Sequence, residues 1–215
     1  MPRIIGVFGG TFDPVHNGHV LTISELLEKL PFEKILVIPN LQPPHRESSQ
    51  VSYKHRYEMA SMAFKDIPKT IVDNRESLRD GPSYAIETVK EIMSEEEGVR
   101  VVMIVGSDSF VDIHSWYKWR ELINLVDFLI LKRPDMPLSK NKNVQDLISS
   151  TRFSEVLLDD RKARSIFEIE MTPVKISSSL IRENIADGKS IDGLINPLVK
   201  DYLKIHGLYG SKNST

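Results

Sequence analysis

The sequence of 215 residues contains no cysteine. A disulfide framework, a thiolate zinc site and a cysteine nucleophile are therefore excluded, and the composition suits a reducing compartment, which we expect to be the cytoplasm. Long apolar runs are missing as well. No stretch of about 18 apolar residues occurs, so no membrane-spanning helix is predicted, and the apolar run at the N-terminus is too short for a signal peptide.

A large net charge is the third absence. The chain has 28 Lys and Arg against 30 Asp and Glu, a formal charge of −2. No global field then attracts nucleic acid or an acidic membrane, and neither is predicted as a partner. An anionic ligand must instead be held by a local cluster of positive groups. The length favours one domain over residues 1–210, with a disordered tail at 211–215. A homo-oligomer stays open.

Short apolar runs alternate with helical spacing along the chain. Strands are predicted at residues 3–8, 34–39, 70–73, 100–106 and 128–134, and helices at 18–30, 51–67, 83–96, 177–187 and 196–205. Residues 135–150 are expected to form an exposed loop with a short helix. This alternation predicts an α/β fold: a Rossmann-like, doubly wound parallel sheet with helices on both faces and a small helical C-terminal part. Ligands of such sheets bind at the carboxyl ends of the strands.

The segment GGTFDPVHNGH, residues 9–19, follows the first predicted strand. Its glycines are expected to adopt positive φ and to let the backbone approach a ligand, while the amides of the next helix favour an anion such as phosphate. His19 in the first helical turn and His16 in the preceding loop would both face that anion. Two alternatives stay open on spacing alone. One is a glycine turn with two exposed histidines, and the other is a zinc or iron site built from Asp13, His16 and His19.

A second polar segment, ISSSLIR, covers residues 176–182. Ser177 or Ser178 could cap the helix that follows, and the free amides and hydroxyls there would form a second anion site. Arg182 lies one turn along and could reach back with a fixed positive charge. The alternative is an ordinary serine-capped helix with an arginine that faces solvent.

Polar segments also follow the second and third predicted strands. NLQPPHR, residues 40–46, presents His45 and Arg46 on a loop that two prolines stiffen; its alternative is a rigid surface loop. GPSY, residues 81–84, precedes a helix that Ser83 is expected to cap, so the amides of that helix become available to a ligand.

The last two strands are followed by further candidates. GSDS, residues 106–109, places Asp108 where it could accept hydrogen bonds from ribose hydroxyls, unless it is a plain helix start. In WYKW, residues 116–119, the ring of Trp116 could stack on a flat ligand, whereas Trp119 could equally be packed in the core. Arg133 adds positive charge after the last strand.

The segment at residues 9–19 resembles the amino-terminal signature of the nucleotidyltransferase superfamily, whose core is an HxGH tetrad, here residues 16–19. Its surroundings look most like bacterial nicotinate-nucleotide adenylyltransferases. An ISSxxIR-like stretch near the carboxyl end is the second hallmark of that family. Counterparts of PPHR, PSY, GxDS and WY occur in the same order, so the resemblance extends from residue 4 to about 209, where it closes with GLY.

The resemblance implies transfer of the adenylyl group of ATP to nicotinic acid mononucleotide, which gives nicotinic acid adenine dinucleotide and pyrophosphate in NAD biosynthesis. It implies catalytic roles for His16, His19 and Arg182. The residues that it implies for ATP binding are Gly9, Gly10, Thr11, Phe12, Gly18, Gly106, Asp108, Ile176, Ser177 and Ser178. Those that it implies for the acceptor are His45, Arg46, Ser83, Tyr84, Ala85, Trp116, Tyr117 and Arg133. Mg²⁺ is expected to be bound mainly by the ATP phosphates, without a metal site in the protein.

Two positions depart from the family pattern: Ala85 and Ser179 stand where relatives often have threonine. The hydroxyl missing at position 85 leaves the preference between acid and amide open, so nicotinamide mononucleotide is an alternative acceptor. The closest alternative family is pantetheine-phosphate adenylyltransferase, although that family usually has threonine in place of His16. A cytidylyltransferase fits PPHR and WY poorly. A regulatory module with an inactive site is disfavoured, because the two histidines and Arg182 are intact.

Overall fold

The computed structural model describes residues 3–41, 49–132, 142, 146, 152–154 and 165–211 of the chain, with only the backbone described at 152–154. Seven strands form one sheet in the order β3-β2-β1-β4-β5-β7-β6, and every neighbouring pair is parallel. The strands are β1 Arg3–Gly10, β2 Lys34–Pro39, β3 Thr70–Val72, β4 Val99–Gly106, β5 Asp127–Lys132, β6 Arg152–Ser154 and β7 Ser165–Glu170. The predicted parallel sheet is thereby confirmed.

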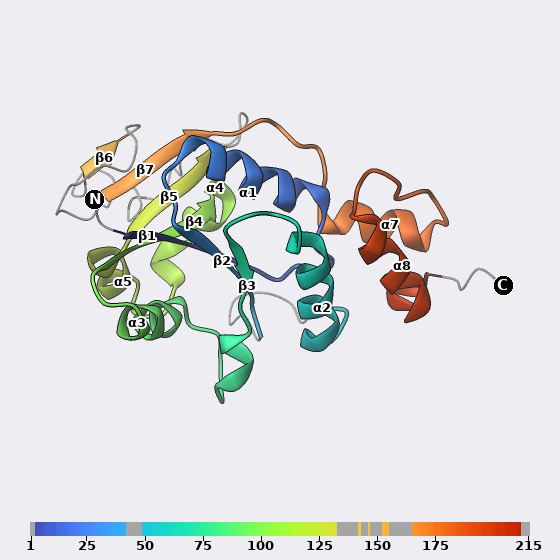
Figure 1. Cartoon of the computed structure of the whole chain (residues 1–215), viewed down its shortest axis with the longest axis horizontal. Helices are drawn as coiled ribbons and strands as arrows, with labels where there is room; N and C mark the ends of the chain where they lie inside the picture. Colours follow the sequence, from blue (N-terminus) through green and yellow to red (C-terminus); the bar gives the residue numbers. More distant parts are fainter. Residues whose placement is uncertain are drawn as a thin grey trace.

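Helices cover both faces of this sheet. They are α1 Asn17–Lys29, α2 Tyr53–Phe64, α3 Ala85–Glu95, α4 Ser107–Phe110, α5 Trp119–Leu125, α7 Ser178–Ala186 and α8 Pro197–Ile205, with short 3-10 turns η1 Arg75–Leu78, η2 Ile113–Ser115 and η3 Leu208–Gly210. Figure 1 shows α1 on one side of the sheet, α3 and α5 on the other, and α7 with α8 at the right-hand end. None of the helices in the described ranges is long and apolar enough to cross a membrane.

The two layers follow from the alternation of buried side chains along β1. Ile4 belongs to an apolar cluster that also holds Ile23 of α1, whereas its neighbour Ile5 belongs to a second cluster with Val89 of α3. Successive strand residues point to opposite faces, so each strand of this sheet contributes to both cores. The first cluster extends to Leu203 of α8, which attaches the C-terminal helices to the sheet. The doubly wound fold with a helical C-terminal part is confirmed.

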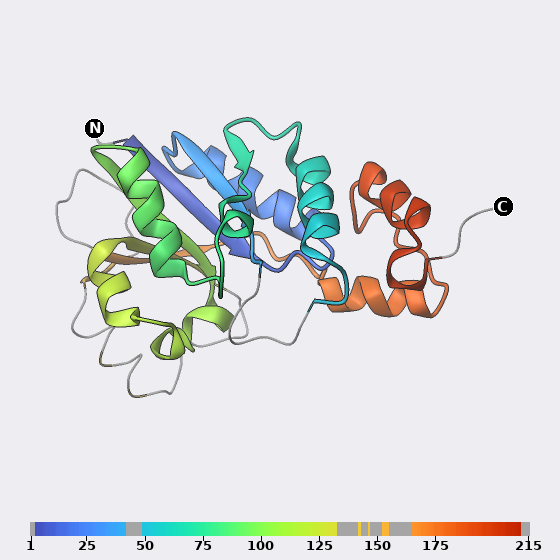
Figure 2. The same cartoon turned by 90° about the horizontal axis from the view of Figure 1, so that it is seen from below.

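The strand order locates the crevice. The chain places β2 and β3 on one side of β1 and then crosses to β4 on the other side. The carboxyl ends of β1 and β4 therefore form the topological switch point, where open parallel sheets bind ligands. The segments that follow these two strands begin the candidate site. Figure 2 shows the same arrangement from below, with α7 and α8 beside this end of the sheet.

The sequence did not predict every element. The strand β7 was missed: Ile166 and Phe167 are buried, but the run has only six residues, two of them glutamates, and it pairs with β5. The helices α4 and α5, with four and seven residues, carry too little periodicity to be recognised. The loop expected at 135–150 lies outside the described residues apart from 142 and 146, and so do 212–215 of the expected tail. A single domain stays a prediction.

Candidate active site

The two motif segments are in direct contact. Ser178 Oγ donates a hydrogen bond to the carbonyl of Pro14 at 2.8 Å, across 164 residues of chain. A terminal nitrogen of Arg182 donates to the carbonyl of Asp13 at 2.7 Å, across 169 residues. Ser177 caps α7, as predicted, with its side chain accepting from the N–H of Leu180 at 3.1 Å. The prediction that both segments fold into one place is confirmed, although Arg182 is held by the first segment itself.

The two imidazoles of the tetrad lie against each other at the start of α1. His16 is the capping residue and His19 the third residue of the helix, as predicted. Their rings stack with centroids 3.7 Å apart and planes at 21°. The N–H of His16 donates to Nδ1 of His19 at 3.2 Å. Because a backbone N–H can only donate, Nδ1 keeps its lone pair, and neutral His19 carries its proton on Nε2.

The positive φ predicted for the glycines of the first segment is wrong, and two of these glycines have a packing role. Gly10 and Gly18 do not have positive φ; the left-handed residue of this loop is Phe12, at φ 51°. A Cβ on Gly10 would lie 2.9 Å from the ring of Phe12, and one on Gly18 would lie 2.9 Å from Nδ1 of His16. The ring of Phe12 in turn meets His19 edge-on at 5.0 Å. Both glycines leave room for the rings that surround His19.

A buried arginine joins the loops that follow β1 and β2. Arg56 of α2 is 1% exposed and donates to the carbonyls of Thr11 at 2.7 Å, Asn40 at 2.8 Å and Leu41 at 3.3 Å. Burial lowers the pKa of its guanidinium, an effect that the nearby carboxylate of Asp13 opposes. The loop after β1 is thus tied to the loop after β2. Nothing in the helical spacing of residues 51–67 distinguishes this arginine from an exposed one, so the sequence did not reveal it.

Asp13 has both carboxylate oxygens engaged. Its Oδ2 accepts from the N–H of Gln50 at 2.8 Å and its Oδ1 from the hydroxyl of Tyr209, and the side chain is buried. The zinc or iron site of Asp13, His16 and His19 is not formed, because no group of three or more His, Cys, Asp or Glu side chains that could hold a metal ion occurs within the described ranges.

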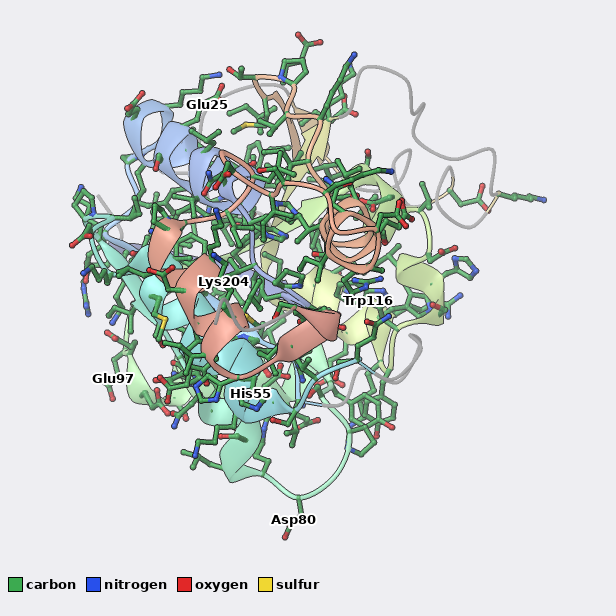
Figure 3. All side chains as sticks on the ribbon, turned by 90° about the vertical axis from the view of Figure 1, so that its right-hand side faces the viewer. Glu25, His55, Asp80, Glu97, Trp116 and Lys204 are labelled. Carbon is green, nitrogen blue, oxygen red and sulfur yellow. The ribbon has the colours of Figure 1, made fainter. Side chains whose placement is uncertain are left out.

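A cavity of about 510 Å³ opens beside these loops, between the carboxyl ends of β1 and β4. Of the predicted site residues, it is lined by Gly9, Gly10, Ser83, Tyr84, Ala85, Gly106, Asp108, Trp116 and Tyr117. The rings of Tyr84 and Tyr117 stack at its wall with centroids 4.3 Å apart. Figure 3 shows Trp116 within the outline of the molecule, to the right of Lys204 of α8. The segments PSY, GxDS and WY, which are separate in the sequence, thus surround one space.

Ser83 does not cap α3, contrary to the prediction. The helix begins at Ala85 with Tyr84 as its capping residue, and Ser83 Oγ instead accepts from the N–H of Leu41 at 3.0 Å. The buried carboxylate of Glu76 supports the same loop: it accepts from Leu41 N–H at 3.3 Å and from the Thr88 hydroxyl at 3.1 Å. Glu76 lines the cavity and was not predicted, because a glutamate in a polar segment gives no sign of burial.

The remaining predicted residues divide into three groups. Asp108 folds back over Gly106, where a Cβ would lie 2.4 Å from its Oδ1, so a side chain at position 106 would displace the Asp108 carboxylate. Ile176 packs against the apolar cluster beneath α1, and the hydroxyl of Thr11 is buried without a hydrogen-bond partner within the described part of the chain. His45, Arg46 and Arg133 lie outside the described residues.

The cytidylyltransferase-like family matches residues 7–184 of this chain. A probable nicotinate-nucleotide adenylyltransferase of Pseudomonas putida (strain GB-1) is 34% identical over 212 residues, which cover 98% of this chain and 97% of the relative. The chain belongs to the nicotinate-nucleotide adenylyltransferases, within the cytidylyltransferase-like family. A second relative in this family, from Pseudomonas fluorescens (strain Pf-5), is 33% identical and covers 99% of this chain and 100% of its own length.

Solved structures agree with the fold. The nicotinic acid mononucleotide adenylyltransferase of Plasmodium falciparum in complex with NaAD superposes with a TM-score of 0.75 at 19% identity and covers 98% of each chain. The same enzyme in complex with APC gives a TM-score of 0.74 at 19% identity, again with 98% of each chain covered. At this level of identity the likeness establishes the shared architecture, including the helical C-terminal part.

Proposed function

We propose that this chain transfers the adenylyl group of ATP to nicotinic acid mononucleotide. The observation that carries the proposal is the pair of hydrogen bonds from Ser178 and Arg182 to the loop before His16, beside a cavity lined by Trp116. Stacked imidazoles, a guanidinium and helix-start amides meet there, as a polyphosphate requires. The adjoining cavity has the volume and the aromatic wall that a pyridine nucleotide requires. The relatives are named nicotinate-nucleotide adenylyltransferases, which supports both the ATP donor and the pyridine nucleotide acceptor.

The reaction is an in-line displacement at the α-phosphorus of ATP. An oxygen of the mononucleotide 5′-phosphate forms the new P–O bond, the bond to the bridging oxygen of the β-phosphate breaks, and pyrophosphate leaves with that electron pair. The acceptor phosphate is already ionised, so no general base is needed, and catalysis consists of positioning and stabilisation of charge. His19 donates from Nε2–H to a phosphate oxygen, a direction that the hydrogen bond at Nδ1 fixes. His16, stacked on it, contacts the same phosphate.

The donor is MgATP, with the ion held by phosphate oxygens and water. The donor set fits this assignment, because the described part of the chain holds no group of three or more His, Cys, Asp or Glu that could bind the ion directly. Arg182 and the amides at the start of α7 hold the leaving pyrophosphate, and Gly9, Gly10 and Thr11 contact the nucleotide through their backbone. These roles follow from charge and placement.

The acceptor occupies the part of the cavity that Tyr84, Ala85, Trp116 and Tyr117 line. Trp116 stacks on the pyridine ring, and main-chain donors near Tyr84, Ala85 and Tyr117 receive its carboxylate. A carboxylate suits these donors better than an amide, whose NH₂ group would face N–H groups, so we expect the acid to be preferred. Arg46 is assigned to the acceptor phosphate. The roles of His45, Arg46 and Arg133, the cytoplasmic location and a homo-oligomer stay predictions.

Pyrophosphate release with ATP and a panel of acceptors tests this function. Nicotinic acid mononucleotide, nicotinamide mononucleotide and phosphopantetheine are compared at equal concentration, and the products are identified by mass. We expect the acid to give the highest kcat/KM and a product of the mass of nicotinic acid adenine dinucleotide. A higher kcat/KM with phosphopantetheine, or no turnover with either pyridine nucleotide, would reject the proposal.

A further inference from the structure

The C-terminal turn η3 reaches into the loop that precedes the HxGH tetrad. Its central residue, Tyr209, donates its hydroxyl proton to Oδ1 of the buried Asp13, 196 residues earlier in the chain. Leu208 beside it is buried, and the turn packs against α7 and α8. Ser211 Oγ donates to the carbonyl of Leu203 at 2.7 Å and so holds the far end of the turn on α8.

The backbone at this turn adopts an uncommon conformation. Tyr209 has φ 56° and ψ 21°, in the left-handed region that side chains other than glycine rarely adopt. Gly207, at φ 58°, allows the chain to leave α8 sharply just before it. A strained residue persists only where its surroundings hold it in place. Here the partly buried ring, packed against the apolar cluster, and the hydrogen bond to Asp13 do so, which indicates that the contact is a specific one.

Asp13 also contacts the other segments around the loop that leads to His16. Its second carboxylate oxygen accepts from Gln50 N–H at 2.8 Å, and its carbonyl accepts from Arg182 at 2.7 Å. The next carbonyl, of Pro14, accepts from Ser178 at 2.8 Å. One residue therefore joins the C-terminal turn, the loop that leads to His16 and the arginine of α7. A shift of Asp13 would move the histidines relative to Arg182.

The hydroxyl of Tyr209 stays protonated and so remains a hydrogen-bond donor to Asp13. Burial, and next the hydrogen bond to Asp13, raise its pKa well above the ordinary value for tyrosine. It therefore remains protonated throughout the neutral range and keeps the carboxylate in one orientation.

We propose that Tyr209 is a positioning residue, which acts through Asp13 to hold the HxGH loop and Arg182 in the arrangement that binds the triphosphate of ATP. This inference rests on the proposed function. Its effect is confined to the donor side, because Tyr209, Asp13 and Arg182 are not among the described residues that line the acceptor cavity. The C-terminal turn is thus part of the ATP site without touching the nucleotide.

The test compares two tyrosine variants. Tyr209→Phe keeps the ring and removes only the hydroxyl, and Tyr202→Phe is the matched control, because the Tyr202 hydroxyl contacts His55 at 2.9 Å instead. His55 and Trp116 occupy separate positions at this end of the molecule (Figure 3). In Tyr209→Phe, KM for ATP should rise on the order of tenfold, as expected for the loss of a hydrogen bond to a charged group. KM for the acceptor should stay within about twofold, and Tyr202→Phe should match the wild type.

A binding measurement and a double variant separate a positioning role of Tyr209 from a merely structural one. Calorimetric titration with a non-hydrolysable ATP analogue should show the same weakening in Tyr209→Phe, and it remains informative if the wild type transfers no adenylyl group to any acceptor. Combined with Asp13→Asn, Tyr209→Phe should add little further loss, since both act through one contact. An unchanged affinity for the analogue, or an equal rise of both KM values together with a lower melting temperature, would overturn the inference.

Discussion

The rings of His16 and His19 stack 3.7 Å apart, and the N–H of His16 donates to Nδ1 of His19. This contact directs the proton of neutral His19 to Nε2, away from the helix backbone. The pair is enclosed by Phe12 on one side and by the glycine at position 18 on the other. The geometry of the tetrad is therefore built into the start of α1 before any nucleotide binds.

Replacing His19 by alanine should lower kcat by on the order of a hundredfold or more, because a preorganised donor to the transferring phosphate is lost. The control is His206→Ala, at the C-terminal end of α8, where its ring lies against those of His55 and Tyr202. Steady-state kinetics and circular dichroism check the result. Turnover at the wild-type rate in a folded His19→Ala protein would refute the role.

Replacing Trp116 by alanine should raise KM for nicotinic acid mononucleotide about tenfold and leave KM for ATP unchanged, since stacking on one face of the pyridine ring is removed. Trp116→Phe keeps an aromatic face and should recover most of the affinity. If the change appeared in KM for ATP alone, the stacking assignment would be wrong.

Gly10→Ala should destabilise the fold by about 1–3 kcal/mol, because the new methyl group would lie 2.9 Å from the ring of Phe12. Gly9→Ala is the matched control: its Cβ would lie 3.5 Å from Oδ1 of Asn40, an ordinary contact. Urea denaturation of both variants measures the difference. Equal stability of the two proteins would show that the Phe12 ring yields freely.

Arg56→Met should lower the free energy of unfolding by several kcal/mol, at about 1–3 kcal/mol for each buried carbonyl left unpaired. Arg120→Met provides the comparison, because Arg120 is exposed and its guanidinium lies over the ring of Trp119, at 4.3 Å. That variant should lose no more than about 1 kcal/mol. Similar losses in the two variants would contradict the role of Arg56 as the tie between the two loops.

Stability should fall above pH 10 in a way that depends on Tyr209. The ordinary pKa of tyrosine is 10.0 and the value in the folded state is raised, so this group stabilises the fold fully below pH 10. The stabilisation is lost as the pH rises further, because the unfolded chain releases the proton first. Tyr209→Phe should make the alkaline slope shallower by up to about 1.4 kcal/mol per pH unit. Unfolding at several pH values measures the slope, and an identical slope in wild type and variant is the contrary outcome.

The central part of the sheet could be predicted from the sequence because β1, β2 and β4 are continuous apolar runs that end at a glycine or a proline. Ile4 to Phe8 and Val101 to Val105 are buried on both faces, and their composition shows it directly. The pairing of β7 with β5 could not be predicted, since it depends on contacts across a segment with little periodicity.

The candidate site was predicted where side chains bear the chemistry, as at the two histidines and Arg182. It was not predicted where burial decides the role. Arg56, Glu76 and Tyr209 look like ordinary surface residues in the sequence, and only the folded chain places them beneath the loops. The positive φ expected at Gly10 and Gly18 was wrong, and the space that they leave for a neighbouring ring could not be predicted because it is a tertiary property.

The most direct test of the central claim is a crystal structure of this protein with a non-hydrolysable ATP analogue and Mg²⁺. The account predicts that one triphosphate lies within hydrogen-bonding distance of both His19 and Arg182, with the acceptor cavity beside Trp116 left open. A triphosphate that contacts only one of these two residues, or that binds elsewhere, would contradict it.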